Sequence, residues 1–542
     1  MTRFFPLLLV LATLAAGLYL RWTEGLDTLG PEIDRSAQHY WAGAFVEAPE
    51  WGILTALRAP RALMERPETK IYQLAGPVWV LPHRVFNLSS MLLISAWKAV
   101  FGGSPSAALG LGFLQAVVVA SACAWLAVGG EVARRAPAGF RKLIGAVVFA
   151  SVMTHPFILV QSSWSSWHTT ALGFMVLAGA AAHRAGSGRS ADWPARTRIL
   201  VGLLLIAALY ASYLLPLLFC AAWGGAALFD AFRHGGREVT FRELRFWAVI
   251  ALSVLPAVVW LVLRPQEASE WVSFWARRDP ILGVRMIGRA VLASSGLLAL
   301  GAVALRMSPP SSKSWRRHFT EEVRTGAPWL AFSLMALALV VVVFNASDLD
   351  RLLVYLIPLQ ILAALAILRL ATPRPKAARA LASVATIAVV LQIGASLQPV
   401  AWLKWVSPAA HSRQEIARLG TEVSSQLLEA ESRGKLALDP QHLAFRNRDL
   451  TALVLVRLGS SSAALTNVER LVDAQNRGDV DGFLRSRIGG GKLPSPLIFV
   501  GDVEAEPLVS ELQSFYDVQP LPFRGTGRAA GWFAMALEPK QD

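Results

Sequence analysis

Two carboxylates near the N-terminal end of the chain have the spacing best suited to shared chemistry. Glu32 and Asp34 lie two positions apart in the sequence PEIDRS. On an extended or turned backbone, one could accept a proton as a general base while the other binds a cation or orients a substrate hydroxyl. His39 and Tyr40 follow closely and are candidates for substrate binding. The alternative is that both acids are solvated loop charges, and spacing alone favours that alternative.

The composition places this acidic pair in a membrane protein. The chain has 542 residues, of which 54% are hydrophobic and 16% charged, whereas soluble domains carry about 25% charged residues. The apolar residues come in long blocks, which is typical of membrane spans. Cys123 and Cys220 both lie inside such blocks, so the cysteines indicate neither a disulfide framework nor a zinc site.

Eleven apolar blocks are long enough to be considered as spans, since a span needs about 20 apolar residues. Tyr213 and Pro216 divide one long block into two, because proline disfavours a continuous helix there. The predicted spans are 4–20, 108–130, 143–160, 169–183, 199–213, 216–232, 246–263, 286–305, 328–344, 352–370 and 380–398.

The distribution of Arg and Lys predicts the orientation of these spans. The net charge of +15 is concentrated in alternate loops, which the positive-inside rule places in the cytoplasm. The N-terminus is then cytoplasmic and the segment after Gln398 extracytoplasmic. If residues 86–101 crossed the membrane, every later basic loop would face outward, so we expect a re-entrant, interfacial or buried helix there. Topology explains the positive charge, and no motif indicates nucleic-acid binding.

Two regions are expected outside the membrane. The first is the loop 21–105, whose stretch WGILTALRAPRALMER has the pattern of a helix in the membrane interface. The second is residues 401–542, where helical patterns at 413–433 and 504–514 accompany strand-like runs. Those runs are 435–439, 452–456, 496–501, 515–521 and 531–537. The predicted fold is an all-α polytopic membrane bundle over 1–400, with about 11 spans, and a small C-terminal extracytoplasmic α/β domain over 401–542.

This order of elements resembles the GT-C glycosyltransferases, which use lipid-linked sugars. Their first outer loop carries an acidic pair, and Glu32-Ile33-Asp34 matches the Glu-x-Asp form of that motif. The stretches MLLISAWKAVFGGSPSAALGLGFLQ and DLDRLLVYLIPLQILAALAIL also resemble family segments. Protein mannosyltransferase-like and aminoarabinose-transferase-like members usually have adjacent Asp-Glu, whereas here the acids are separated. It stays open which acid is the base and whether Asp27 participates instead.

The resemblance implies an enzyme at the outer face of a bacterial inner membrane. Its donor would be a sugar on a polyprenyl phosphate, and its acceptor a glycan, a lipid or a protein. Asp34 or Glu32 would deprotonate the acceptor hydroxyl with inversion at the sugar. A divalent cation, Mg²⁺ or Mn²⁺, could assist, and the sequence leaves the metal requirement open.

Arginines on the outer side are the candidates for holding the donor phosphate, because a departing phosphate needs cationic partners. Arg277, Arg278 and Arg285 lie in an outer loop that breaks the charge rule. Arg351, at the outer end of a late span, is a further candidate. The alternative for all four is pairing with neighbouring acidic residues.

His168 and Tyr355 complete the candidate substrate-binding residues. His168 follows the sequence WSSW near the outer surface, where aromatic side chains could stack on a sugar ring. The alternative, that these tryptophans belong to an interfacial aromatic belt, is favoured. Tyr355 lies between Arg351 and Pro358, in the late span that resembles the family's.

Other membrane functions fit this order of elements less well. O-antigen ligases and polymerases keep their large outer loop late in the chain, whereas here it comes first. Transporters and flippases often have repeated halves and charged or broken helices at mid-membrane, and this sequence has no visible repeat. A non-catalytic scaffold with the same fold would share every feature described above.

Overall fold

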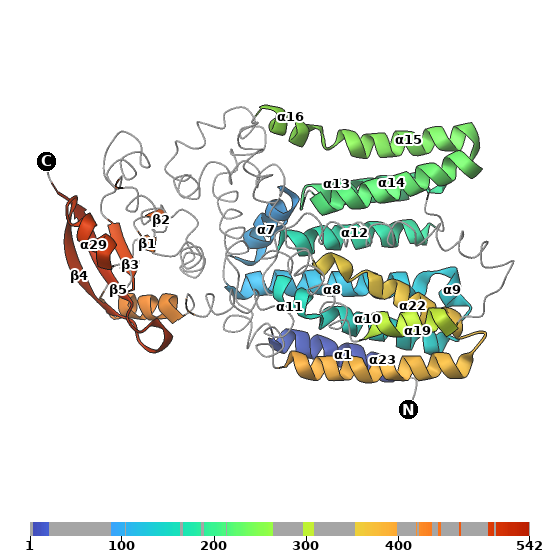
Figure 1. Cartoon of the computed structure of the whole chain (residues 1–542), viewed down its shortest axis with the longest axis horizontal. Coiled ribbons are helices and arrows are strands. Elements are labelled where there is room, and N and C mark those ends of the chain that lie inside the picture. The colour runs from blue at the N-terminus through green and yellow to red at the C-terminus, as the bar shows by residue number, and fades with distance from the viewer. Residues whose placement is uncertain are drawn as a thin grey trace. The chain divides into compact units, whose positions relative to one another are not determined.

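The computed structural model of the chain is mostly helical, with a small sheet near its C-terminal end (Figure 1). It divides into two compact units, one formed by Met1–Trp22 with Gly112–His411 and the other by Thr23–Leu111 with Ser412–Asp542. The residues that the structure describes are 4–20, 88–102, 105–162, 166–185, 189–212, 214–263, 296–307, 353–397, 419, 422–435, 443–445, 466–467, 478, 497–502 and 506–540.

The predicted spans that fall among the described residues contain helix. Only the span 328–344 lies wholly outside them. The helices are α1 Phe5–Tyr19, α8 Pro105–Gly129, α10 Ala138–Met153, α12 Trp167–Arg184, α13 Ala195–Leu209, α14 Leu214–His234, α15 Gly236–Leu252, α16 Leu255–Leu263, α19 Leu297–Met307, α22 Leu359–Leu370 and α23 Pro375–Ser396.

Three of the described helices are long and apolar enough to cross a membrane, by length and composition. They comprise Ser106–Gly129, Leu215–Arg233 and Pro375–Ser396. Several other described apolar helices are shorter, including Phe5–Tyr19, Leu297–Met307 and Val354–Leu370. The total of about eleven spans, which rests on hydrophobic block length, stays a prediction.

Prolines interrupt three of the predicted spans. The block 143–160 is divided into α10 and the short helix α11 Pro156–Gln161, and the block 246–263 into α15 and α16, with Pro256 in the first turn. The block 352–370 becomes the 3₁₀ turn η6 Leu353–Leu356 followed by α22, whose N-cap is Pro358. Proline lacks an N–H and fixes its own φ, so it fits a helix start better than an interior. The predicted break at Pro216 is also confirmed, since α13 ends at Leu209 and α14 begins at Leu214.

Small residues allow close packing within the helical unit. A Cβ on Gly301 of α19 would lie 2.5 Å from the Cα of Ala363 on α22, which is closer than atoms can approach. This glycine therefore lets the two helix backbones come together, as small residues do in membrane helix bundles. The neighbouring pairs α12–α13 and α14–α15 are also in extensive contact.

The other unit contains a five-stranded mixed sheet with the order β2-β1-β3-β5-β4. Its strands are β1 Leu443–Phe445, β2 Thr466–Asn467, β3 Leu497–Gly501, β4 Tyr516–Arg524 and β5 Phe533–Pro539. Strand β1 pairs in parallel with β2 and β3, and β5 pairs antiparallel with β3 and β4. The predicted strands at 496–501, 515–521 and 531–537 are confirmed, as is the helix between the first two, α29 Glu506–Leu512. The predicted strand 452–456 lies outside the described residues, as does almost all of 435–439.

The segment predicted to be a re-entrant or interfacial helix is helical. Helix α7 runs from Leu88 to Phe101 and ends at Gly102, which has a φ of +81°. The indole Nε1 of Trp97 donates a hydrogen bond to the carbonyl of Ala107 at 2.7 Å. This contact ties α7 to the first turn of α8.

Candidate functional site

Two of the predicted substrate-binding residues, His168 and Tyr355, lie together in the structure. The Tyr355 hydroxyl is 3.4 Å from His168 Nδ1, and the hydroxyl of Ser212 is 3.3 Å from the same nitrogen. The rings of His168 and Tyr355 meet edge to face, with centroids 5.9 Å apart. All three side chains are buried. An imidazole nitrogen between two hydroxyls can accept a hydrogen bond from either of them, or donate to one, according to the tautomer.

The three residues come from three breaks in the helical bundle. His168 is in the first turn of α12, Ser212 follows the end of α13, and Tyr355 is in η6. The turn η6 contacts both α11 and α12. Because helix interruptions, rather than helix interiors, carry the three groups, we name them the interruption cluster.

Hydrogen bonds of the first turn fix the position of His168. The hydroxyl of Ser166 caps α12 by accepting from the Thr169 N–H at 3.1 Å. The Thr169 hydroxyl donates to the carbonyl of Gln161 at 3.1 Å, and the Thr170 hydroxyl donates to the carbonyl of Ser166 at 2.8 Å. These bonds connect the start of α12 to the end of α11, so the imidazole is mounted on a rigid turn.

Further buried polar groups lie on α8, α11 and α22. Gln115 of α8 donates through Nε2 to the Thr170 hydroxyl at 2.8 Å. Within the described part of the chain, Gln161 Nε2 and both amide atoms of Gln360 are buried without a hydrogen-bond partner. Unsatisfied buried amide groups cost free energy, and native structures usually pair them with protein or with water. The hydrogen bonds among the described polar groups therefore leave these amide atoms of Gln161 and Gln360 unsatisfied.

The remaining predicted site residues lie outside the described residues. They are the acids Glu32 and Asp34, the neighbours His39 and Tyr40, and the arginines Arg277, Arg278, Arg285 and Arg351. Among the residues that are described, no three His, Cys, Asp or Glu side chains are grouped as metal ligands. The catalytic, phosphate-binding and metal assignments therefore remain predictions.

Comparison of the whole fold with solved structures gives a clear result. The chain is similar to the crystal structure of ArnT from Cupriavidus metallidurans in the apo state, with a TM-score of 0.54 and 15% sequence identity, over 96% of this chain and 97% of that one. It is also similar to ArnT from the same organism bound to undecaprenyl phosphate, with a TM-score of 0.55 and 14% identity over 97% of both chains. ArnT is an aminoarabinose transferase. The chain has the GT-C glycosyltransferase fold.

The sequence itself matches no protein-family model and no curated protein. Together with the apolar helices, the GT-C fold indicates a membrane protein. The resemblance predicted from the order of spans, loop and C-terminal domain is thus confirmed at the level of the fold.

Sequence reasoning missed one member of the interruption cluster, Ser212. Ser212 could have been suspected, because it precedes the predicted break at Tyr213 and Pro216. A second histidine, His155, precedes His168 by thirteen residues. In the GT-C fold of this chain it is buried, and its Nδ1 accepts from the Phe157 N–H at 3.3 Å. That bond gives His155 a structural role at the start of α11.

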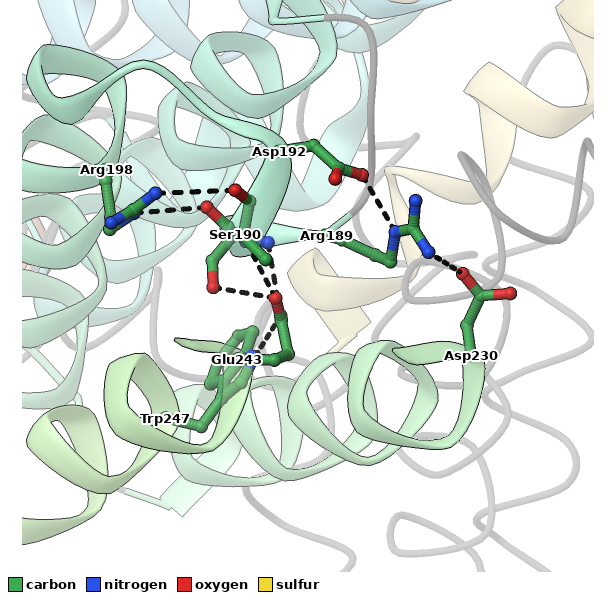
Figure 2. A network of polar contacts seen from close by, with 8 residues as sticks. Arg189, Ser190, Asp192, Arg198, Asp230, Glu243 and Trp247 are labelled. Atoms are coloured by element: carbon green, nitrogen blue, oxygen red, sulfur yellow. Dashed lines mark hydrogen bonds and ion pairs between the residues drawn. The ribbon is translucent and has the colours of Figure 1, made fainter. Parts of the chain in front are cut away.

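A second buried polar network surrounds Glu243 of α15 (Figure 2). Its carboxylate accepts hydrogen bonds from the Ser190 N–H at 3.1 Å, the Ser190 hydroxyl at 2.8 Å and the Ala191 N–H at 2.9 Å. The Trp247 indole donates a fourth at 2.8 Å. These donors satisfy the carboxylate and cap the 3₁₀ turn η4 Ser190–Asp192. Glu243 therefore connects α15 to the segment between α12 and α13.

Two arginines stabilise the same turn from its other sides (Figure 2). Arg198 donates to the carbonyls of Ser190 at 3.1 Å and Trp193 at 3.2 Å. Arg189 pairs with Asp192 at 2.8 Å and with Asp230 of α14 at 3.6 Å. Because its groups pair with one another and its carboxylate is saturated with donors, this network is a structural joint between helices.

Proposed function

We propose that the protein is a membrane glycosyltransferase that transfers a sugar from a polyprenyl-phosphate-linked donor to an acceptor hydroxyl of a glycan, lipid or protein. The observation that carries the proposal is the similarity of fold to ArnT bound to undecaprenyl phosphate, over 97% of both chains. The acceptor and the sugar are left general.

The reaction would be a single displacement at the anomeric carbon. The acceptor oxygen forms a bond to that carbon while the bond to the phosphate oxygen breaks, and the phosphate leaves with the electron pair. Glu32 or Asp34 would take the acceptor proton, since a carboxylate within reach of that hydroxyl is a suitable general base. Attack from the face opposite the phosphate inverts the configuration.

Positive charge would stabilise the departing phosphate. Arg277, Arg278, Arg285 and Arg351 are the proposed partners, because guanidinium groups bind phosphate oxygens in a bidentate geometry. A divalent cation held by the acidic pair, such as Mg²⁺ or Mn²⁺, is the alternative source of that charge.

The interruption cluster is the described part of the proposed site. His168 and Tyr355 were proposed as substrate-binding residues from the sequence alone, and their side chains are 3.4 Å apart. When the Ser212 hydroxyl, 3.3 Å from His168 Nδ1, supplies the hydrogen bond that this nitrogen accepts, the Tyr355 hydroxyl is left to donate its own proton to a sugar hydroxyl or a phosphate oxygen. This geometry supports the proposal that both residues act at the same site.

The lipid-linked donor places the reaction at a membrane surface. We propose about eleven spans, a cytoplasmic N-terminus and a periplasmic C-terminal domain, with the site at the outer face of a bacterial inner membrane. The membrane module would comprise residues 1–400, including the outer loop 21–105, and the periplasmic domain residues 401–542. The Arg- and Lys-rich loops support this orientation through the positive-inside rule.

The test is sugar transfer by the full-length protein in proteoliposomes. Undecaprenyl phosphate carrying radiolabelled sugars is the donor panel, and Glu32→Gln and Asp34→Asn are compared with wild type. Glu429→Gln, on the exposed surface of the helix at 422–432, is the matched control. We expect the control to retain transfer and at least one of the first two variants to lose it. Full transfer by both variants would reject the acidic pair, and movement of the donor across the bilayer without transfer would favour a flippase.

A further inference from the structure

The hairpin of α14 and α15 exposes arginine and phenylalanine side chains on one continuous stretch. The exposed fractions are 65% for Phe229, 81% for Phe232 and 67% for Phe241. Arg233, Arg237, Arg242 and Arg245 are exposed in the same stretch. We call these seven residues the hairpin patch. It belongs to neither the interruption cluster nor the predicted acidic site.

The buried carboxylate of Glu243 explains why the arginines of α15 face outward. Glu243, Phe246, Trp247 and Ile250 lie on the buried side of this helix. Arg237, Phe241 and Arg245 succeed one another at intervals of four residues, which aligns them on one exposed face. The network of Figure 2 fixes that rotation, because Glu243 is held by four hydrogen bonds.

The exposed charge of the hairpin is strongly positive. Glu238 is the acidic residue that is exposed on α15, and it pairs with Arg242. The acid of α14, Asp230, follows Phe229 directly and pairs with Arg189, which lies outside the patch. Arg233, Arg237 and Arg245 form no ion pair with either of these two described carboxylates.

The hydropathy of the two helices locates the patch at a membrane boundary. The apolar segment Leu215–Arg233 is one of those able to span a membrane, and it ends at the first arginine of the patch. On α15, the exposed face changes from Arg and Phe to apolar residues after Arg245, including Val249 and Leu252. Aromatic and basic residues at such a transition are typical of the headgroup region.

We propose that the hairpin patch binds the headgroups of anionic phospholipids in the adjacent leaflet. The phenylalanine rings would enter the acyl-chain boundary while the arginines contact lipid phosphates. Charge complementarity selects an anionic lipid over a zwitterionic one, and each basic residue near the surface contributes on the order of a five-fold change in binding. This surface is independent of the proposed transferase activity.

Lipid binding to the full-length, detergent-purified protein tests the proposal. Phosphatidylglycerol and phosphatidylcholine with identical acyl chains are titrated, and bound copies are counted by native mass spectrometry. We expect tighter binding of phosphatidylglycerol to wild type, and a loss of that preference of ten-fold or more, from about five-fold per arginine, in the triple variant Arg233→Gln, Arg237→Gln and Arg245→Gln.

A matched triple variant removes three charges elsewhere. Arg374, Lys376 and Arg379 are exposed at the start of α23, and their replacement by glutamine should leave the preference intact. The proposal is overturned if the hairpin variant keeps the preference, if both variants lose it equally, or if the hairpin variant instead changes the oligomeric state, which would identify the patch as a protein contact.

If the hairpin variant fails to fold, the unfolding temperature of the wild-type protein tests the proposal instead. Phosphatidylglycerol should raise the unfolding temperature more than phosphatidylcholine does at about 0.1 M salt. The difference should vanish near 1 M salt, where the Debye length falls from roughly 10 Å to 3 Å. A salt-independent stabilisation would contradict an electrostatic contact with lipid headgroups.

Discussion

Tyr355 and His168 are 187 residues apart in the sequence, yet the phenol oxygen lies 3.4 Å from the imidazole Nδ1. The pair joins η6, which precedes α22, to the first turn of α12. Both side chains are buried, so their hydroxyl and ring nitrogen must be matched with each other, with Ser212 or with a bound molecule.

Removal of the Tyr355 hydroxyl should impair transfer more than folding. We expect Tyr355→Phe to lower kcat/KM by about 10- to 100-fold, corresponding to one hydrogen bond in the transition state. Tyr210→Phe is the control, since that hydroxyl donates to the Ser253 carbonyl at 2.6 Å and lies outside the interruption cluster. Equal activity of the two variants would show that the Tyr355 phenol does not act on substrate.

His168 should act through Nδ1. In His168→Asn, a side-chain oxygen can replace Nδ1 as an acceptor, whereas His168→Ala removes it. We expect the alanine variant to lose transfer and the asparagine variant to recover part of it, at unchanged donor binding. Steady-state kinetics that separate kcat from KM check this expectation, and a variant pair with identical kcat values would contradict it.

The Glu243 network should make a large contribution to stability. Glu243→Ala leaves the Ser190 and Ala191 N–H groups and the Trp247 indole without their acceptor, so we expect a loss of about 3 kcal/mol or more. Glu238→Gln, at an exposed position on the same helix, should change stability by less than about 0.5 kcal/mol. The two variants are compared by thermal unfolding in the same detergent. Equal unfolding midpoints would contradict the expected contribution of the Glu243 network.

Gly301 should tolerate no side chain. Its Cβ would be 2.5 Å from Ala363 Cα, so Gly301→Ala must separate α19 from α22, and we expect a loss of about 1–3 kcal/mol. Gly225→Ala on α14 has no atom within 4 Å of the added carbon and should be neutral or slightly stabilising, because alanine favours helix. If Gly301→Ala unfolds at the wild-type temperature, the close approach of the two helices is wrong.

The orientation can be tested by cysteine labelling. Glu32→Cys and Arg316→Cys are made separately and exposed to a membrane-impermeant maleimide in intact cells and in inverted vesicles. Native Cys123 and Cys220 are buried and should not react. We expect labelling of position 32 from outside and of position 316 from inside. Labelling of both from one side would remove the acidic pair from the proposed site.

The helices could be predicted because long apolar blocks have few alternatives in a membrane. Interruptions were predicted less well. Pro216 was recognised as a break, while Pro156, Pro256 and Pro358 were included in continuous spans although they start or precede helices in the same way. The strands β1 and β2 were also missed, since Leu443–Phe445 and Thr466–Asn467 are too short to show an alternating pattern.

The sequence identified two residues of the candidate site, His168 and Tyr355, but not the contact between them. His168 and Tyr355 were selected separately, one beside WSSW and the other from a resemblance, and no local pattern indicates that they touch. Ser212 was not selected, because an isolated serine before a helix break has many ordinary roles. Glu243 was not selected either, because it lies in a segment whose many arginines indicated a cytoplasmic loop. Its partners include backbone N–H groups, which a sequence does not reveal.

The 3₁₀ turn before Pro358 determines the direction in which Tyr355 points. Successive residues advance by roughly 120° in a 3₁₀ turn and by roughly 100° in an α-helix. Over the four residues of η6, Leu353–Leu356, that difference accumulates to about 60°, a sixth of a revolution. A helix that continued through Pro358 would therefore rotate the phenol about the helix axis relative to α22, so the break at this proline is part of what brings Tyr355 to His168.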